Sequence, residues 1–249
     1  MLQTNNVHHL KEVRSAARLG AEPDGLRALF RKQPAECLSA GQSLFFEGDM
    51  AKHLFEVVGG SLRIFKIISD GRRVITGFAH VGDIVGVSLK SHYLYSAEAI
   101  VDTRIRRLSR RAFEAEITRC PDLQSKMFSH LCDEMAAAQD QMVLLSRKSA
   151  EERVCTFLRK QVQRGSAFPG SSALVELPMT RLDIADYLGL TIETVSRTMT
   201  RLARRGIVCP VDRHTVRVMK YGVLVQLSGD DEYYGDEPIQ IPYAGGNHH

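Results

Sequence analysis

Residues 180–197 constrain the fold of this chain most, because they have the spacing of two short helices joined by a tight turn. Thr180 can cap the N-terminus of the first helix, Gly189 permits the sharp turn, and Thr191 can cap a second helix. The second helix presents polar side chains from its first turns, where a recognition helix meets base edges in the major groove. The segment therefore predicts a helix-turn-helix that reads double-stranded DNA.

Four side chains at the start of the second predicted helix are candidates for base contacts. Arg197 can donate two hydrogen bonds to guanine, and Glu193 can accept one from cytosine N4. Ser196 and Ile192 can approach the oxygens and methyl groups of thymine. The candidates for contacts to the DNA backbone lie at the helix starts or carry positive charge, and they are Thr180, Arg181, Thr191, Thr194, Arg201, Arg205 and Arg213.

Positive charge gathers around this segment, although the whole chain is only mildly basic with a formal net charge of +4. Arginines recur from Arg197 to Arg217, and no Lys or Arg follows Lys220. The stretch after residue 229 is instead rich in Asp and Glu. The basic block can meet phosphates, whereas the acidic tail cannot.

Residues 36–108 have the pattern of a compact antiparallel β-structure. Short apolar segments at 54–58, 62–68 and 74–78 are separated by recurrent glycines. Asp70-Gly71, between two of these segments, is a signal for a hairpin turn. We therefore expect a β-barrel or jelly-roll-like domain of the sensor type.

Beyond Pro121 the apolar period changes from that of strands to that of a helix. Apolar residues recur at steps of three and four over about six helical turns, and they are Leu123, Met127, Leu131, Met135, Ala138, Met142 and Leu145. One long amphipathic helix is predicted. Its narrow stripe can pack on its own domain or form a coiled-coil seam with a second copy, and periodicity does not distinguish the two.

A capping box at Ser149 and Glu152 starts a new helix, so we expect a hinge near Lys148. After the helix-turn-helix, segments 206–208 and 215–218 flank a turn and predict a β-hairpin wing. The expected domains, in chain order, are an N-terminal arm (1–25), a β-roll (26–120), a long helix (121–148), a winged helix (149–228) and an acidic tail (229–249).

Composition excludes several other classes of protein. The length of 249 residues and the hydrophobic content of 44% fit two modest domains. No apolar run is long enough to span a membrane and the N-terminus lacks an apolar signal core, so a cytoplasmic location is expected. The sequence has no nucleophile elbow, P-loop or HExxH motif, which argues against an enzyme. Five scattered cysteines without a CxxC pair predict reduced thiols.

The order of β-roll, long helix and winged helix, together with several local strings, resembles the CRP/FNR family of transcription regulators over roughly residues 26–225. The strings are Gly77-Phe78, Gly82-Asp83-Ile84-Val85-Gly86, Gln139-Asp140-Gln141-Met142-Val143-Leu144-Leu145, Ala150-Glu151-Glu152-Arg153 and Tyr187-Leu188-Gly189-Leu190-Thr191-Ile192-Glu193-Thr194-Val195-Ser196-Arg197. All five strings are similar to the FNR branch; the last two are specific to that branch and most similar to its FixK group. The implied fold class is α+β, with a cyclic-nucleotide-binding-like jelly roll, a long dimerisation helix and a winged helix-turn-helix.

The resemblance also implies partners and a target. In the family the long helix is the dimer interface, which here means the stripe of Leu123, Met127, Leu131, Met135, Met142 and Leu145. The FNR branch reads TTGA-type half-sites, so a TTGA-N6-TCAA-like palindrome is expected. RNA polymerase is the implied protein partner. Membership of the FixK group implies activation of genes for low-oxygen respiration, nitrogen fixation or denitrification.

The ligands common in this family each need residues that can be checked here. Its cyclic-nucleotide binders carry an Arg-Ser pair for the phosphate and a Glu for the ribose, and the matching positions hold Tyr95-Ser96 and Val87. Without the Arg, a buried phosphate lacks its charge-assisted partner. Cyclic-nucleotide binding is therefore not expected.

Metal cofactors are not expected either. Oxygen-sensing members hold an iron–sulfur cluster with four cysteines, but the arm up to Pro34 has none, and Cys37 and Cys120 are too few. Axial haem ligands could come only from isolated histidines of the roll, which are His53, His80 and His92.

Two hypotheses remain. The first is a homodimeric activator that needs no small-molecule effector. The alternative is the same fold gated by an unrecognised ligand in the roll or by oxidation of a cysteine. Cys209, next to Pro210 at the wing, is the only cysteine near the predicted DNA surface and is the candidate for redox control.

Overall fold

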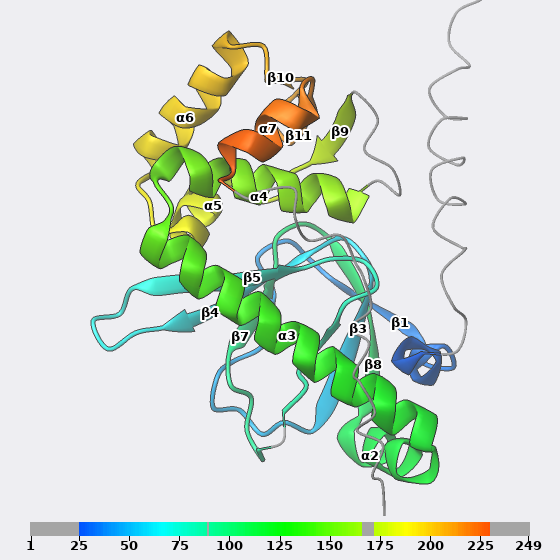
Figure 1. Ribbon diagram of the computed structural model, residues 1–249. Helices are drawn as coiled ribbons and strands as arrows, with labels where there is room; N and C mark the ends of the chain where they lie inside the picture. Colours follow the sequence, from blue (N-terminus) through cyan, green and yellow to red (C-terminus); the bar gives the residue numbers. More distant parts are fainter. Residues whose placement is uncertain (1–24, 89, 166–171, 230–249) are drawn as a thin grey trace, which may run out of the picture. The chain divides into compact units, whose positions relative to one another are not determined.

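The computed structural model describes residues 25–88, 90–165 and 172–229 (Figure 1). Most of the expected N-terminal arm (1–25) and acidic tail (229–249) lies outside these residues. The chain divides into two compact units, and the boundary between them falls after Ala136. The second unit contains the residues from Ala137 onward together with Arg73–Ile75.

The first unit, together with the short segment Arg73–Ile75, is a β-roll of two antiparallel sheets with four strands each. Its strands are β1 (Ala35–Leu38), β2 (Ser43–Phe45), β3 (His53–Gly59), β4 (Leu62–Ile67), β5 (Arg73–Ala79), β6 (Ile84–Val85), β7 (Ser96–Ala99) and β8 (Thr103–Ser109). The strand order is β1-β8-β3-β6 in one sheet and β2-β7-β4-β5 in the other. This arrangement confirms the predicted jelly-roll-like fold.

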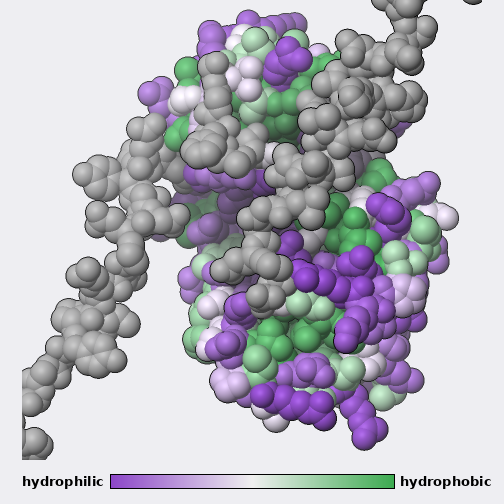
Figure 2. All heavy atoms as spheres, turned by 90° about the vertical axis from the view of Figure 1, so that its right-hand side faces the viewer, coloured by the Kyte–Doolittle hydropathy of each residue, from purple (hydrophilic) through white to green (hydrophobic). Residues whose placement is uncertain are grey.

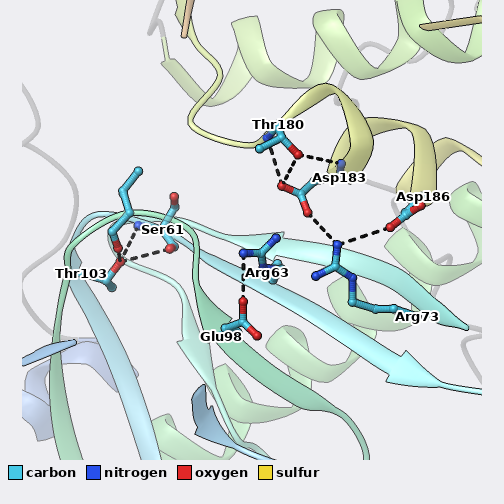
Figure 3. Close-up of polar contacts among 9 residues, drawn as sticks. Ser61, Arg63, Arg73, Glu98, Thr103, Thr180, Asp183 and Asp186 are labelled. Carbon is cyan, nitrogen blue, oxygen red and sulfur yellow. Dashed lines mark hydrogen bonds and ion pairs between the residues drawn. The ribbon is translucent and has the colours of Figure 1, made fainter. Parts of the chain in front are cut away.

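Alternation along the strands builds the core of the roll. In β8, Thr103, Ile105 and Leu108 are buried while arginines between them reach the surface. On the other sheet, Arg63 of β4 faces Glu98 of β7 and forms an ion pair of 2.9 Å with it (Figure 3). Opposite charges at facing positions support this strand register.

Two turns of the roll depend on glycine. Gly71 has φ +82°, and its N–H donates to the carbonyl of Ile68 at 2.9 Å, which confirms the predicted hairpin turn. Gly60, between β3 and β4, has φ +79° and lies close to the connection between β7 and β8. An added Cβ would be 2.6 Å from the carbonyl oxygen of Asp102 in that connection. The hydroxyl of Thr103 ties this corner together by accepting from the Ser61 N–H at 3.1 Å (Figure 3).

Helices flank the roll at both chain ends. A short 3-10 helix, η1 (Leu26–Phe30), precedes it, and α2 (Arg110–Arg119) and α3 (Pro121–Arg147) follow. The sequence predicted α3 but not α2, although Ser109 caps α2 by accepting from the N–H of Ala112. A serine at position 109 could indicate the start of a helix only if the preceding strand was already known to end there.

The second unit is a winged helix. Its elements after α3 are α4 (Ala150–Gly165), β9 (Ala173–Glu176), α5 (Arg181–Leu188), α6 (Ile192–Arg204), β10 (Val208–Pro210), β11 (Thr215–Val218) and α7 (Tyr221–Leu227). The strands form one sheet in the order β10-β11-β9. The predicted α+β fold class with a winged helix-turn-helix is confirmed, whereas α7 was not predicted.

The start of α4 matches its sequence signal. The Ser149 N–H donates to Glu152 Oε2 at 2.6 Å, and the Glu152 N–H donates to Ser149 Oγ at 3.4 Å. These reciprocal bonds are the predicted capping box. Lys148 closes the other side of this corner, because its Nζ donates to the Ser228 carbonyl at 2.9 Å, just beyond the end of α7.

None of the helices in the described part of the chain combines the length and the apolar character needed to cross a membrane.

We predict that Gly60→Ala destabilises the roll more than Gly71→Ala does. Both replacements force a side chain into a left-handed backbone at about 1–2 kcal/mol. Only the Cβ at position 60 also meets backbone atoms, at 2.6 and 2.7 Å, whereas nothing lies within 4 Å of the Cβ at position 71. Overpacking adds about 1–3 kcal/mol at position 60. Urea unfolding measures the difference, and equal losses of unfolding free energy would contradict the close approach.

Candidate nucleic-acid interface

The first helix of the reader begins at a side-chain cap. The Asp183 N–H donates to Thr180 Oγ1 at 3.1 Å, and the Thr180 N–H donates to Asp183 Oδ2 at 3.0 Å (Figure 3). Two of the N–H groups that the start of α5 leaves without intrahelical partners are therefore satisfied by side chains. The helix ends at Leu188 because Gly189 adopts the left-handed conformation, with φ +61°, and its N–H donates to the Ala185 carbonyl. The predicted cap and turn are both confirmed.

The second helix, α6, begins at Ile192, three residues after Gly189. Its cap is Thr191, whose hydroxyl accepts from the Thr194 N–H at 3.2 Å. One face of α6 is buried and consists of Val195, Thr198, Met199 and Leu202. The opposite face is exposed, and the first two turns place Ile192, Glu193, Ser196 and Arg197 on it. The structure thus brings all four candidates for base contacts together on one accessible surface.

The candidates for DNA backbone contacts occupy three environments. Thr180 and Thr191 are exposed but serve as helix caps, and the Thr194 hydroxyl lies 3.0 Å from that of Thr191. Arg181 is half-buried, and burial lowers the pKa of its guanidinium, which still stays charged near neutral pH. Arg213 is exposed on the wing turn.

The remaining two candidates, Arg201 and Arg205, are held by an acid that the sequence did not single out for this role. Glu151 lies in the first turn of α4 and forms ion pairs with both, at 3.5 Å to Arg201 and 2.9 Å to Arg205. The two pairs join the C-terminal half of α6 to α4. The arginine side chains remain 59% and 45% exposed, so contacts to phosphates stay a prediction for them.

The wing is a tight hairpin. The Val211 N–H donates to the Thr215 carbonyl at 2.9 Å, and the His214 N–H donates to Asp212 Oδ1 at 2.7 Å. This bond from the His214 backbone is the main cause of the lowered pKa of Asp212, which keeps a negative charge beside Arg213. Cys209 lies on β10 and is exposed.

Exposed apolar side chains mark a second surface of interest. Figure 2 shows one face of the molecule, on which apolar residues lie in separate patches bordered by hydrophilic ones. Isolated exposed apolar residues are ordinary in folded proteins, but several on one helix are informative. On α3, the exposed members of the predicted stripe are Leu131 (36%), Met135 (60%), Met142 (63%) and Leu145 (40%), and Phe128 (70%) lies on the same helix although the stripe omitted it.

Two members of the predicted dimerisation stripe pack against their own domain. Leu123 and Met127 pack against a cluster of the roll that contains Phe30, Leu54 and Phe113. For these two residues the structure realises the alternative of packing on their own domain, because the first turns of α3 cover the apolar cluster beside η1 and α2. The exposed part of the stripe therefore begins at Leu131, and Phe128 adds to the exposed apolar surface of α3.

The positions in the roll that matter for ligands are filled by its own side chains. The Tyr95 hydroxyl accepts a hydrogen bond from the Gly86 N–H at 2.9 Å, and Tyr95 packs against the main core cluster. Burial raises the pKa of Tyr95 to about 12, so the phenol is neutral at physiological pH. Val87 is half-buried in the apolar cluster that contains Leu54 and Phe30.

Cysteines and histidines do not gather into a metal site within the described ranges, where no group of three or more His, Cys, Asp or Glu side chains could hold an ion. Cys37 and Cys209 are exposed, and Cys155 is buried. Burial raises the pKa of the Cys155 thiol to about 12, which makes it a poor nucleophile at neutral pH.

Comparisons with known proteins agree with this geometry. Residues 152–227 match the model of the Crp-like helix-turn-helix domain, and residues 35–120 match that of the cyclic nucleotide-binding domain. The nitrogen fixation regulation protein FixK of Bradyrhizobium diazoefficiens is 42% identical over 68% of this chain and 72% of its own length. The transcriptional activatory protein AadR of Rhodopseudomonas palustris is 41% identical over 67% of this chain and 70% of its own length.

Among solved structures, FixK2 from Bradyrhizobium japonicum matches with a TM-score of 0.75 and 34% identity. The match covers 80% of this chain and 98% of that one. The likeness therefore includes the β-roll, the long helix and the winged helix together.

Proposed function

We propose that this chain activates transcription as a homodimer that reads a palindromic DNA site. The chain belongs to the CRP/FNR family of transcription regulators and, within it, to the FNR branch and the FixK group. The observation that carries the proposal is the exposed face of α6, where Glu193, Ser196 and Arg197 lie on the first two turns with their supporting residues buried behind them. This is the part of a recognition helix that meets base edges.

The target follows from the chemistry of these side chains. Arg197 supplies a bidentate donor for guanine, Glu193 an acceptor for cytosine N4, and Ser196 with Ile192 a polar and an apolar contact for thymine. FNR-branch proteins carry the same Glu, Ser and Arg spacing and read TTGA half-sites. We infer a TTGA-N6-TCAA-like palindrome, with the phosphate backbone contacted by Thr180, Arg181, Thr191, Thr194, Arg201, Arg205 and Arg213.

The proposed dimer interface is the exposed apolar part of α3. Phe128, Leu131, Met135, Met142 and Leu145 would be covered when two copies of the helix pair. Burying apolar area gains about 25 cal/mol per Å². A two-fold dimer also matches the symmetry of a palindrome, because each copy then presents one α6 to one half-site.

Relatives named for regulation of nitrogen fixation and for activation of transcription support the biological setting. We infer that the chain recruits RNA polymerase to genes of low-oxygen respiration, nitrogen fixation or denitrification.

The contacts inside the roll support activity without a small-molecule effector. Tyr95 stands where cyclic-nucleotide binders of the family carry their phosphate-binding Arg, and its hydroxyl takes the Gly86 N–H. Val87, at the position of the ribose-binding Glu, lies among apolar side chains. The alternative is a roll gated by an unrecognised ligand, or control by oxidation of the exposed Cys209.

We predict that Arg197→Ala and Arg213→Ala weaken DNA binding in different ways. The first removes a bidentate contact to guanine and should cost about 1–3 kcal/mol with relaxed preference at that base. The second removes a backbone contact and should weaken binding to all sequences while lowering the salt slope by about 1. Fluorescence anisotropy at several salt concentrations separates the two. The assignment fails if selection of binding sites returns one consensus for the wild type and for the double variant Glu193→Ala/Arg197→Ala.

We predict that replacing Leu131 and Met135 with Glu produces a monomer that binds the palindrome far more weakly. Four carboxylates would meet at a dimer interface that needs apolar contact. Light scattering measures the mass. The matched control is Ser129→Glu/Ala136→Glu, which adds the same charges at exposed positions of α3 outside the stripe. A dimeric double variant of the stripe would show that the interface lies elsewhere.

We predict that purified protein binds the TTGA-N6-TCAA site with no added nucleotide, and that cyclic AMP changes the Kd by less than about twofold, because Tyr95 occupies the phosphate-binding position. Anisotropy with and without nucleotide, and with and without a mild oxidant, tests this. A strict requirement for a ligand would favour the gated alternative. Loss of binding on oxidation in wild type but not in Cys209→Ser would assign redox control to Cys209.

A further inference from the structure

Three successive carbonyls at the turn of the reader receive hydrogen bonds from side chains outside the helix-turn-helix. Gln141 of α3 donates through Nε2 to the Tyr187 carbonyl at 2.9 Å. Arg153 of α4 donates through Nη1 to the carbonyls of Leu188 at 3.0 Å and Gly189 at 3.4 Å. These are carbonyls that the end of α5 leaves without intrahelical partners.

The same guanidinium also binds the end of α3. Its Nη2 donates to the Leu145 carbonyl at 2.9 Å, and its Nε donates to the Lys148 carbonyl at 2.9 Å. One positive charge therefore lies at the C-terminal, electronegative ends of two helices. We call Gln141, Arg153 and the five carbonyls that they bind the carbonyl clamp.

Only an arginine fits this position. Four directed bonds from three nitrogens of one planar group need the fork geometry of a guanidinium, and a lysine ammonium on a single flexible stem cannot reproduce it. Packing at the turn is also tight. A Cβ on Gly189 would lie 3.3 Å from Leu145 and 3.4 Å from Arg153 Nη1. The last turn of α3 and the turn of the reader are thus in direct contact within the second unit.

The consequence concerns α6, which starts two residues after Gly189 at its Thr191 cap. Fixing the turn against the end of α3 fixes the direction in which α6 leaves that turn. If α3 pairs two copies, the clamp also fixes the separation of the two recognition helices. One base pair of spacer changes the position of a half-site by about 3.4 Å along the DNA axis and rotates it by about a tenth of a turn.

We propose that Gln141 and Arg153 are positioning residues for DNA recognition, and that the carbonyl clamp sets which half-site spacing the dimer accepts. This inference rests on the proposed function as a dimeric DNA reader. The proposal gives a role to Gln141 and Arg153, which lie in two of the sequence strings typical of the family but are not among the residues proposed to contact bases. Neither side chain needs to touch DNA for this role.

The test measures spacing preference in two conservative variants. Arg153→Lys keeps the charge but loses the fork, and Gln141→Glu keeps the shape but turns the donor into an acceptor. Each protein is titrated with palindromes of N5, N6 and N7 spacing and with a single TTGA half-site, at several salt concentrations. Light scattering and thermal unfolding are recorded on the same samples. The matched control is Gln139→Glu, the same substitution at an exposed position of the same helix.

We expect wild type and Gln139→Glu to prefer N6 over N5 and N7 by tenfold or more. Both clamp variants should lose at least tenfold affinity for N6, with the preference falling to about threefold or less. Their half-site affinity and salt slope should stay within twofold of wild type, because no phosphate contact is lost.

Two outcomes would overturn the proposal. In the first, both variants keep the wild-type spacing preference. In the second, half-site and N6 affinities fall together with thermal stability, which would mean that the clamp only holds the winged helix folded. Failure of the wild type to bind any TTGA site would instead overturn the proposed function, so the two failures are distinguishable.

Discussion

Short helices leave peptide groups without partners at both ends, and the DNA-reading unit depends on how these groups are satisfied. Thr180 and Thr191 supply acceptors at the starts of α5 and α6, each from a side chain three residues before the N–H that it binds. The ends of α3 and α5 are satisfied differently, by donors that converge from Gln141 and Arg153. The first kind of contact defines each helix, and the second kind joins one helix to another.

This difference explains how much of the unit could be predicted from the sequence. Caps, capping boxes and left-handed glycines are local, so residue types at a fixed spacing were enough to place Thr180, Gly189 and Thr191. The clamp is not local, because Gln141 and Tyr187 are 46 residues apart and Arg153 and Leu188 are 35 residues apart. No periodicity connects such positions. The ion pairs of Glu151 in α4 with Arg201 and Arg205 could not be predicted for the same reason, because these residues are far apart in the sequence.

The apolar stripe of α3 shows a second limit of sequence patterns. Steps of three and four predicted the helix, and the glycine-punctuated segments before it predicted the jelly roll. Periodicity cannot say what covers an apolar face, however, and α3 uses its stripe in two ways. Leu123 and Met127 are partly buried against residues of η1 and of α2, a helix that the sequence did not predict, whereas Met135 and Met142 are exposed. Only the packing of the first unit separates the two groups.

Inside the roll, a tyrosine side chain satisfies a backbone N–H at the position expected for a ligand. A buried backbone N–H without an acceptor costs about 1–3 kcal/mol. Tyr95 supplies that acceptor to Gly86, and its hydroxyl stays neutral because burial raises its pKa to about 12. Its ring packs beside Phe45, with centroids 5.6 Å apart, and so fills space as well. An anion that entered here would have to displace both the bond and the ring, and this cost is the physical basis of the proposal that the roll works without a nucleotide.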